Sequence, residues 1–242
     1  MKRIIKISLI LLLVGMAVIA AVPFLKEKRA ERKYENDFKN IQENLTEKKA
    51  DVNGLVKKNK DCIGYVEIPG TTISYPVMQT KDKPDFYLNH DFNRNYSFYG
   101  TPYLSAYCDV NKSDNLIIYG HNINGGKMFG ALEQYKDKDF FNKHRKIYFT
   151  TDKKREYEVF AVMSVNIHEF EYWKFVMARD EKEYDEFVDK VEEHSLWRQE
   201  NKPKYGEKML MLSTCDNGKG DNWRIVVIGK ENYNNEEADT TE

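Results

Sequence analysis

Two apolar runs near the carboxyl end, joined by a short polar loop, constrain the fold of this chain more than any other feature. Residues 209–212 lead, through two small polar residues, to Cys215, and Arg224 opens a second run at residues 225–228. The residues between the two runs are polar and rich in glycine, which is typical of a turn. The pattern predicts two buried strands, and if these pair antiparallel, Cys215 lies beside Arg224.

A thiol next to a guanidinium is a candidate nucleophile. The positive charge favours the thiolate, which is the reactive form of cysteine. The alternative for Cys215 is a buried structural thiol, because free cysteine is among the residue types most often buried. Whether the chain also supplies a general base decides between the two.

His121 is the histidine best placed to act as that base. It follows the apolar run at residues 115–119 and a glycine, so its imidazole stands at a strand end where the backbone is free to turn. Histidine can remove a proton from a thiol and return one to a leaving amine near neutral pH. In acyl transfer, Arg224 would stabilise the negative charge that develops on the carbonyl oxygen, an effect worth about 3–4 kcal/mol. The other histidines lie in charged stretches or loops: His90, His144, His168 and His194.

The body of the chain is predicted to be mostly β-structure. Short runs of strand-forming residues recur before the two carboxyl-terminal runs, at residues 63–68, 72–77, 100–104, 115–119, 146–150 and 156–165. One amphipathic helix is predicted at residues 181–197, because its apolar side chains recur at helical spacing. Seven or eight short strands without βαβ alternation predict a closed or nearly closed antiparallel β-barrel.

Composition argues against several classes of protein. Charged residues make up 32% of the chain and the net charge is −1, so nothing indicates a nucleic-acid-binding surface. Three cysteines are too few for a disulfide scaffold, and whether Cys62 and Cys108 are paired stays open. No His/Cys pair has the spacing of metal ligands, so we expect neither a metal nor a cofactor.

The amino end carries the longest apolar segment. Residues 7–24 run for 18 residues without a charge after a basic start, which is long enough to cross a bilayer. The pattern favours an uncleaved membrane anchor at residues 1–25, rather than a cleaved signal segment, with the catalytic domain outside the cell. The remaining domains are predicted as a helical stalk (26–60), a catalytic β-barrel domain (61–231) and a polar tail (232–242).

Three separate stretches together resemble the sortases, which are membrane-anchored cysteine transpeptidases of Gram-positive bacteria. They are Leu212-Ser-Thr-Cys215, the arginine nine residues after it, and the histidine after an aliphatic run. The resemblance covers roughly residues 61–230, and Met211 stands where the family signature usually begins with threonine. The stalk, the helix before the cysteine strand and the Tyr119-Gly-His-Asn context are similar to class B sortases in particular.

The resemblance implies a closed eight-stranded barrel in which His121, Cys215 and Arg224 are the catalytic residues. It also implies that the enzyme cleaves a carboxyl-terminal sorting motif of a secreted protein after threonine, through a thioester. The secreted protein would then be transferred to a peptide amine of the cell wall.

Three more residues are expected, from their positions alone, to line the substrate groove: Ser213, Tyr119 and Leu88. Two other functions remain compatible with the residues. A secreted cysteine peptidase would hydrolyse its substrate, since a Cys–His pair serves hydrolysis and transfer alike. In a non-catalytic, surface-binding barrel the thiol of Cys215 would be structural and inert towards thiol reagents.

Overall fold

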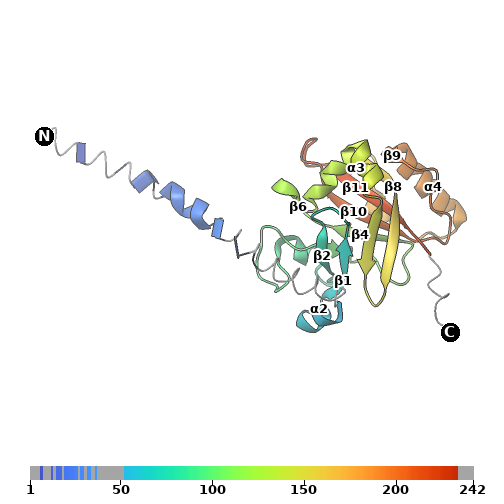
Figure 1. The fold of residues 1–242 in the computed structure, drawn as a ribbon, viewed down its shortest axis with the longest axis horizontal. Coiled ribbons are helices and arrows are strands. Elements are labelled where there is room, and N and C mark those ends of the chain that lie inside the picture. Colours follow the sequence, from blue (N-terminus) through green and yellow to red (C-terminus); the bar gives the residue numbers. More distant parts are fainter. Residues whose placement is uncertain are drawn as a thin grey trace. The chain divides into compact units, whose positions relative to one another are not determined.

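The computed structural model describes residues 52–233 without a gap and, before them, residues 6–7, 12, 15–17, 19–26, 28–29, 32–33 and 36. The chain divides into two units, Met1–Lys49 and Ala50–Glu242 (Figure 1). The described residues of the first unit are helical and exposed. Most of the predicted stalk and most of the predicted tail lie outside the described residues. Helix α2 (Val52–Lys58), with Val52 and Leu55 buried, covers the end of the stalk range.

The predicted membrane anchor has to be corrected. Crossing a bilayer takes about 20 consecutive apolar residues in one helix. Within the described part of the chain, no helix has the length and apolar character that a crossing requires. On that finding, the predicted location at the cell membrane, with an amino-terminal anchor and an external domain, is wrong.

Eight strands of the second unit close into a barrel, as predicted. The order around the barrel is β11-β10-β4-β3-β2-β1-β7-β8, and pairing of β8 with β11 closes it. The strands are β1 (Cys62–Glu67), β2 (Ser74–Met78), β3 (Tyr103–Leu104), β4 (Asn115–Tyr119), β7 (Lys146–Thr150), β8 (Lys154–Asn166), β10 (Met209–Cys215) and β11 (Trp223–Glu231).

The pairing is not antiparallel throughout. Strand β10 runs parallel to β4, and β2 runs parallel to β3. Parallel neighbours need a long connection between them, and nearly ninety residues of chain separate β4 from β10. The parallel β4–β10 pair brings the carboxyl ends of these two strands to the same end of the barrel.

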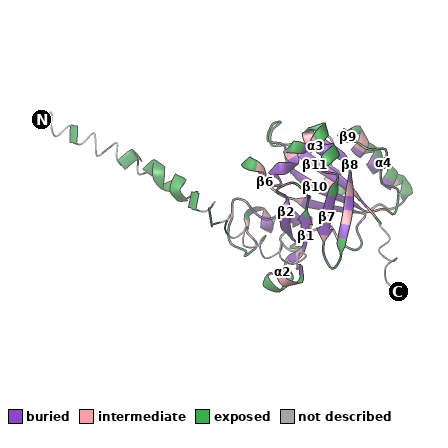
Figure 2. Ribbon diagram, viewed as in Figure 1, coloured by how far each residue is buried: buried purple, intermediate pink, exposed green. Residues whose placement is uncertain are grey.

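The core is built on the most apolar strands. Every residue of β10 from Met209 to Thr214 is buried, and so is the 225–229 segment of β11 (purple in Figure 2). Strands buried on both faces read as continuous apolar runs rather than as alternating ones. The outer cover comes from short helices: η3 (Gly130–Lys136), α3 (Lys138–Lys143) and α4 (Glu181–Glu193).

The predicted helix at 181–197 is shorter than expected. Asp180 caps the start of α4 by accepting a hydrogen bond from the Glu183 amide, and the helix ends at Glu193. The apolar face is buried as expected. Residues beyond the end form β9 (Ser195–Arg198), which pairs with β8 outside the closed ring. Strand β9 pairs with the part of the 13-residue strand β8 that β7 leaves free. This pairing satisfies backbone groups of β8 that a longer helix would have left unpaired.

Candidate active site

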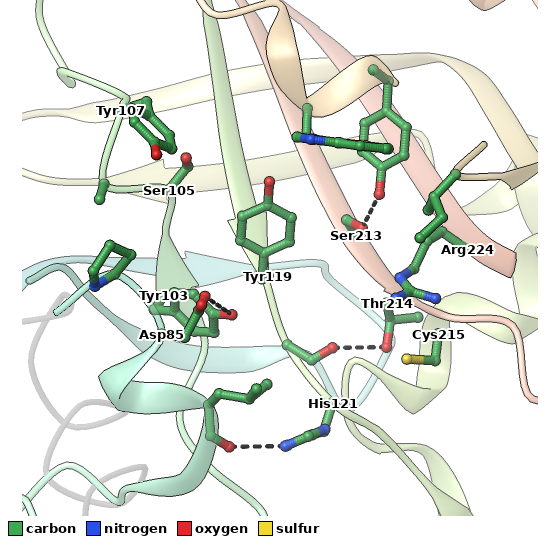
Figure 3. A pocket seen from close by; sticks show the side chains of 17 residues that line it. Asp85, Tyr103, Ser105, Tyr107, Tyr119, His121, Ser213, Thr214, Cys215 and Arg224 are labelled. Atoms are coloured by element: carbon green, nitrogen blue, oxygen red, sulfur yellow. Dashed lines mark hydrogen bonds between the residues drawn. The ribbon is translucent and has the colours of Figure 1, made fainter. Parts of the chain in front are cut away.

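Cys215 and Arg224 are directly opposite each other on two neighbouring strands. Cys215 is the last residue of β10, and its Cα partner in the antiparallel ladder with β11 is Arg224. Two backbone carbonyl groups hold the guanidinium: its Nη1 donates hydrogen bonds to the carbonyl oxygens of Asp221 (2.6 Å) and Trp223 (2.9 Å). The predicted juxtaposition of a half-buried thiol and a fixed positive charge is therefore present (Figure 3).

His121 lies just past the end of β4, the parallel neighbour of β10. Its Nε2 lies 2.8 Å from the carbonyl oxygen of Leu88, in the 3₁₀ helix η1 (Phe86–Asn89). A carbonyl oxygen can only accept, so Nε2 carries a hydrogen and Nδ1 is the nitrogen left for chemistry. Gly120 is required before it, because a Cβ there would lie 2.8 Å from the ring of Phe129.

One pocket of about 560 Å³ joins the predicted site residues. Its wall includes all six of them: Leu88, Tyr119, His121, Ser213, Cys215 and Arg224. Figure 3 shows His121 and Cys215 at one end of the pocket, with Arg224 above the thiol. These six residues come from four elements or their ends, η1, β4, β10 and β11, although Leu88 and Arg224 are far apart in sequence.

Other parts of the wall were not predicted. Tyr172, from the 3₁₀ helix η4 (Tyr172–Lys174), shares a 2.7 Å hydrogen bond with Ser213, and Trp173 lines the pocket beside it. Tyr103 donates to Asp85 over 3.2 Å on the opposite side. The sequence signal for this part of the wall is the aromatic-rich stretch at residues 170–175, but no local sequence pattern indicates that this stretch packs against β10.

Burial keeps three tyrosines of the wall neutral: Tyr103, Tyr119 and Tyr172. Burial raises the pKa of Tyr172 to about 12, although its hydrogen bond with Ser213 and the charge of Arg224 work in the other direction. Burial also raises the pKa values of Tyr103 and Tyr119 well above their ordinary range. These hydroxyl groups therefore keep their protons at neutral pH and add no negative charge next to Cys215.

The other two cysteines are of a different kind. Cys62 and Cys108 are both free and buried, so the structure does not pair them. Burial raises the pKa of each thiol to about 11. Among the described residues, no group of histidine, cysteine and acidic side chains could hold a metal ion.

Comparison with known proteins agrees with this geometry. The model of the Sortase domain matches residues 66–232. The chain belongs to the sortase family. Sortase B of Staphylococcus aureus is 28% identical over 240 residues, which is 95% of this chain and 97% of that protein. Sortase B of Listeria monocytogenes is 33% identical over 180 residues, 73% of this chain and 72% of that protein.

Solved sortase structures have the same fold. The X-ray structure of Clostridium perfringens sortase B matches with a TM-score of 0.70 and 30% identity, covering 74% of this chain and 98% of that one. A Staphylococcus aureus sortase B–substrate complex matches with a TM-score of 0.72 and 28% identity, covering 86% and 97%. The predicted family is confirmed, and this sortase is most like class B.

Proposed function

We propose that this sortase cleaves a carboxyl-terminal sorting motif after threonine, holds the amino-terminal product as a thioester on Cys215, and passes it to an amine. Family membership makes the chain a cysteine transpeptidase. The observation that carries the residue assignment is the meeting of His121, Cys215 and Arg224 in one pocket at the ends of β4, β10 and β11.

In the first step, the sulfur of Cys215 attacks the carbonyl carbon of the substrate threonine. The carbonyl π electrons move to the oxygen, and Arg224 stabilises the resulting negative charge. Its backbone contacts fix the guanidinium before substrate arrives, so little reorganisation is needed in the transition state.

In the second step, the bond to the leaving amine breaks and the carbonyl re-forms as a thioester. His121, which has received the thiol proton, gives a proton from Nδ1 to the leaving nitrogen. The hydrogen bond from Nε2 to the Leu88 carbonyl keeps the ring oriented during this transfer.

In the third step, an incoming amine attacks the thioester. Its surplus proton goes to His121, and Cys215 leaves as the thiolate. Return of that proton from His121 to the sulfur restores the enzyme, and one amide has replaced another. By the family's chemistry, the substrates are secreted proteins with a sorting motif and the acceptor is a cell-wall peptide amine. Ser213, Tyr119 and Leu88 are proposed to contact the motif, since they line the pocket beside the thiol.

A peptide library tests this function. Peptides with varied residues around a threonine would be incubated with the enzyme, with and without an added amine such as triglycine. We expect cleavage after threonine, a faster reaction with the amine, and a new amide product. The Cys215→Ala variant should cleave nothing. Hydrolysis that the amine neither accelerates nor diverts would indicate a peptidase, and full activity of Cys215→Ala would refute the assignment.

A further inference from the structure

A side chain next to His121 contacts the backbone of Cys215. The Asn122 Nδ2 group donates one hydrogen bond to the Cys215 carbonyl oxygen (2.7 Å) and another to Glu133 Oε1 (2.8 Å). Asn122 directly follows the proposed base in sequence. The side-chain amide of Asn122 thus links the residue that follows His121 directly to the backbone of Cys215.

A lysine completes the connection on the far side. Lys136 Nζ lies 2.5 Å from Glu133 Oε2 and 2.6 Å from Asp216 Oδ1. Asp216 is covalently bonded to Cys215. The contacts therefore form a closed ring, which we call the Asn122 ring: Asn122, Glu133, Lys136, Asp216 and the Cys215 carbonyl.

Asp216 is the buried and most tightly held member of the ring. The side chain of Asp216 is 0% exposed, and it also accepts a 2.7 Å hydrogen bond from Ser164 on β8. Burial opposes its ionisation, yet the hydrogen bonds from Lys136 and Ser164 outweigh burial and hold the pKa of Asp216 below its ordinary value. Asp216 is thus an ionised, fully paired carboxylate directly after the proposed nucleophile.

The strand ladder leaves a gap that the ring fills. Pairing of β10 with β4 ends at Ser213 and Tyr119, two residues before Cys215 and His121 respectively. Beyond it, two hydrogen bonds continue the contact as far as Gly120: its amide donates to the Ser213 carbonyl and its carbonyl accepts from Thr214 Oγ1. No bond of the β4–β10 ladder reaches His121 or Cys215. Beyond that ladder, contacts of Asn122 and Asp216, with two longer ones from Asn217 to Glu133 and to the Asn122 carbonyl, connect the two segments.

We propose that the Asn122 ring fixes the distance between His121 and Cys215, which makes Asn122 and Lys136 positioning residues for the transfer reaction. The inference rests on the proposed function. Neither side chain is among the residues that line the pocket, so neither would touch the substrate. Misplacing a reacting group by about 1 Å can cost about 100-fold in rate, and that loss should fall on kcat rather than on KM.

A double-mutant cycle tests the proposal. The variants Asn122→Ala, Lys136→Met and the double variant would be compared with the wild type for cleavage of a peptide that the wild type accepts. We expect each single change to lower kcat by about 10- to 100-fold with KM changed by less than about threefold. The double variant should lose about as much as the worse single variant, because either change already opens the ring.

The matched control is Lys143→Met, which removes an exposed lysine from helix α3 and should leave kcat unchanged. Thermal unfolding shows whether each variant is folded. If Lys136→Met unfolds because Asp216 loses its partner, Lys136→Met combined with Asp216→Asn takes its place in the cycle.

A kcat loss below tenfold in either single variant, a loss expressed mainly in KM, or a double loss equal to the product of the two would overturn the ring proposal. An inactive wild type, or an active Cys215→Ala variant in the same assay, would instead overturn the proposed function, and the ring proposal would fall with it.

Discussion

The hydrogen bond to the Leu88 carbonyl determines which ring nitrogen of His121 is left to exchange a proton. Since this contact occupies Nε2, the proposed mechanism carries the transferred proton at Nδ1. Arg224 is oriented in a similar way, by backbone carbonyls rather than by side chains. Backbone carbonyl oxygens therefore orient the side chains of both His121 and Arg224.

Replacing Arg224 by lysine should be costly although the charge is retained. The planar guanidinium contacts two carbonyl oxygens through Nη1 and still has other N–H groups to offer, whereas an ammonium is a point donor on a flexible stem. We expect kcat/KM for peptide cleavage to fall by about 100-fold. Arg198→Lys, on the exposed strand end of β9, is the control for the same change elsewhere. A loss below tenfold would show that Arg224 acts only through its charge.

Thiol labelling should single out Cys215 in the native protein. The pKa of each buried thiol, Cys62 and Cys108, is raised to about 11, so both stay protonated and inaccessible at pH 8. Intact-mass measurement after iodoacetamide treatment should find one label per native chain and three after denaturation. A native label on Cys62 or Cys108, found by peptide mapping, would contradict this picture.

At the scale of elements, the 3₁₀ helix η1 and the loop after it act as the support of His121. The backbone of Gly100, at φ 60°, packs directly against η1: a Cβ there would overlap the Leu88 carbonyl and lie 2.7 Å from the Tyr87 carbonyl. The conformation and the close approach both require glycine at this position. The Leu88 carbonyl is the atom that orients the imidazole, so this packing supports the proposed role of His121.

Gly100→Ala should therefore damage catalysis as well as stability. Gly206→Ala is a matched control, since Gly206 has φ 89° but no atom within 4 Å of the added Cβ. Both variants carry the strain of a positive φ, about 1–2 kcal/mol, but only Gly100→Ala displaces the support of His121. We expect at least a tenfold lower kcat for Gly100→Ala and little change for Gly206→Ala. Equal activities in the two variants would argue against a supporting role for η1.

Helix α4 contributes to stability through its apolar face. Phe187 is buried and stacks on Phe175, with ring centroids 3.8 Å apart. Phe187→Ala should lower the free energy of unfolding by about 3 kcal/mol, because it leaves a cavity. Lys182→Ala, on the exposed face, should change it by less than about 0.5 kcal/mol. Urea unfolding measures both, and a loss below 1 kcal/mol for Phe187→Ala would show that α4 is loosely docked.

The strands that the sequence predicts best are those with the strongest local signal. Residues 115–119 and 209–215 each contain an uninterrupted apolar run, and glycine or polar residues follow each segment, so both strands and their ends were predictable. Strand β9 was assigned to the helix before it, because Leu196 and Trp197 continue an apolar pattern and only pairing with β8 makes them a strand. Tertiary pairing here overrides the local pattern.

At the scale of the whole molecule, closure of the barrel assembles the site. Cys215 and Arg224 are neighbours through an antiparallel pair, which their spacing in sequence predicts, whereas His121 joins them through the parallel β4–β10 pair. The wall formed by Tyr172 and the ring through Lys136 depend on long-range packing. No short sequence pattern encodes such contacts, so they could not be predicted.

The central claim is that the sulfur of Cys215 carries the substrate as a thioester. Intact-protein mass spectrometry after brief mixing with a cleavable peptide, without an added amine, tests it most directly. We expect a mass increase equal to the acyl fragment that ends at the threonine (the free peptide acid less one water), mapped to Cys215 and removed by triglycine with formation of an amide. Peptide cleavage without any adduct on Cys215, or an adduct that persists in Cys215→Ala, would contradict the account.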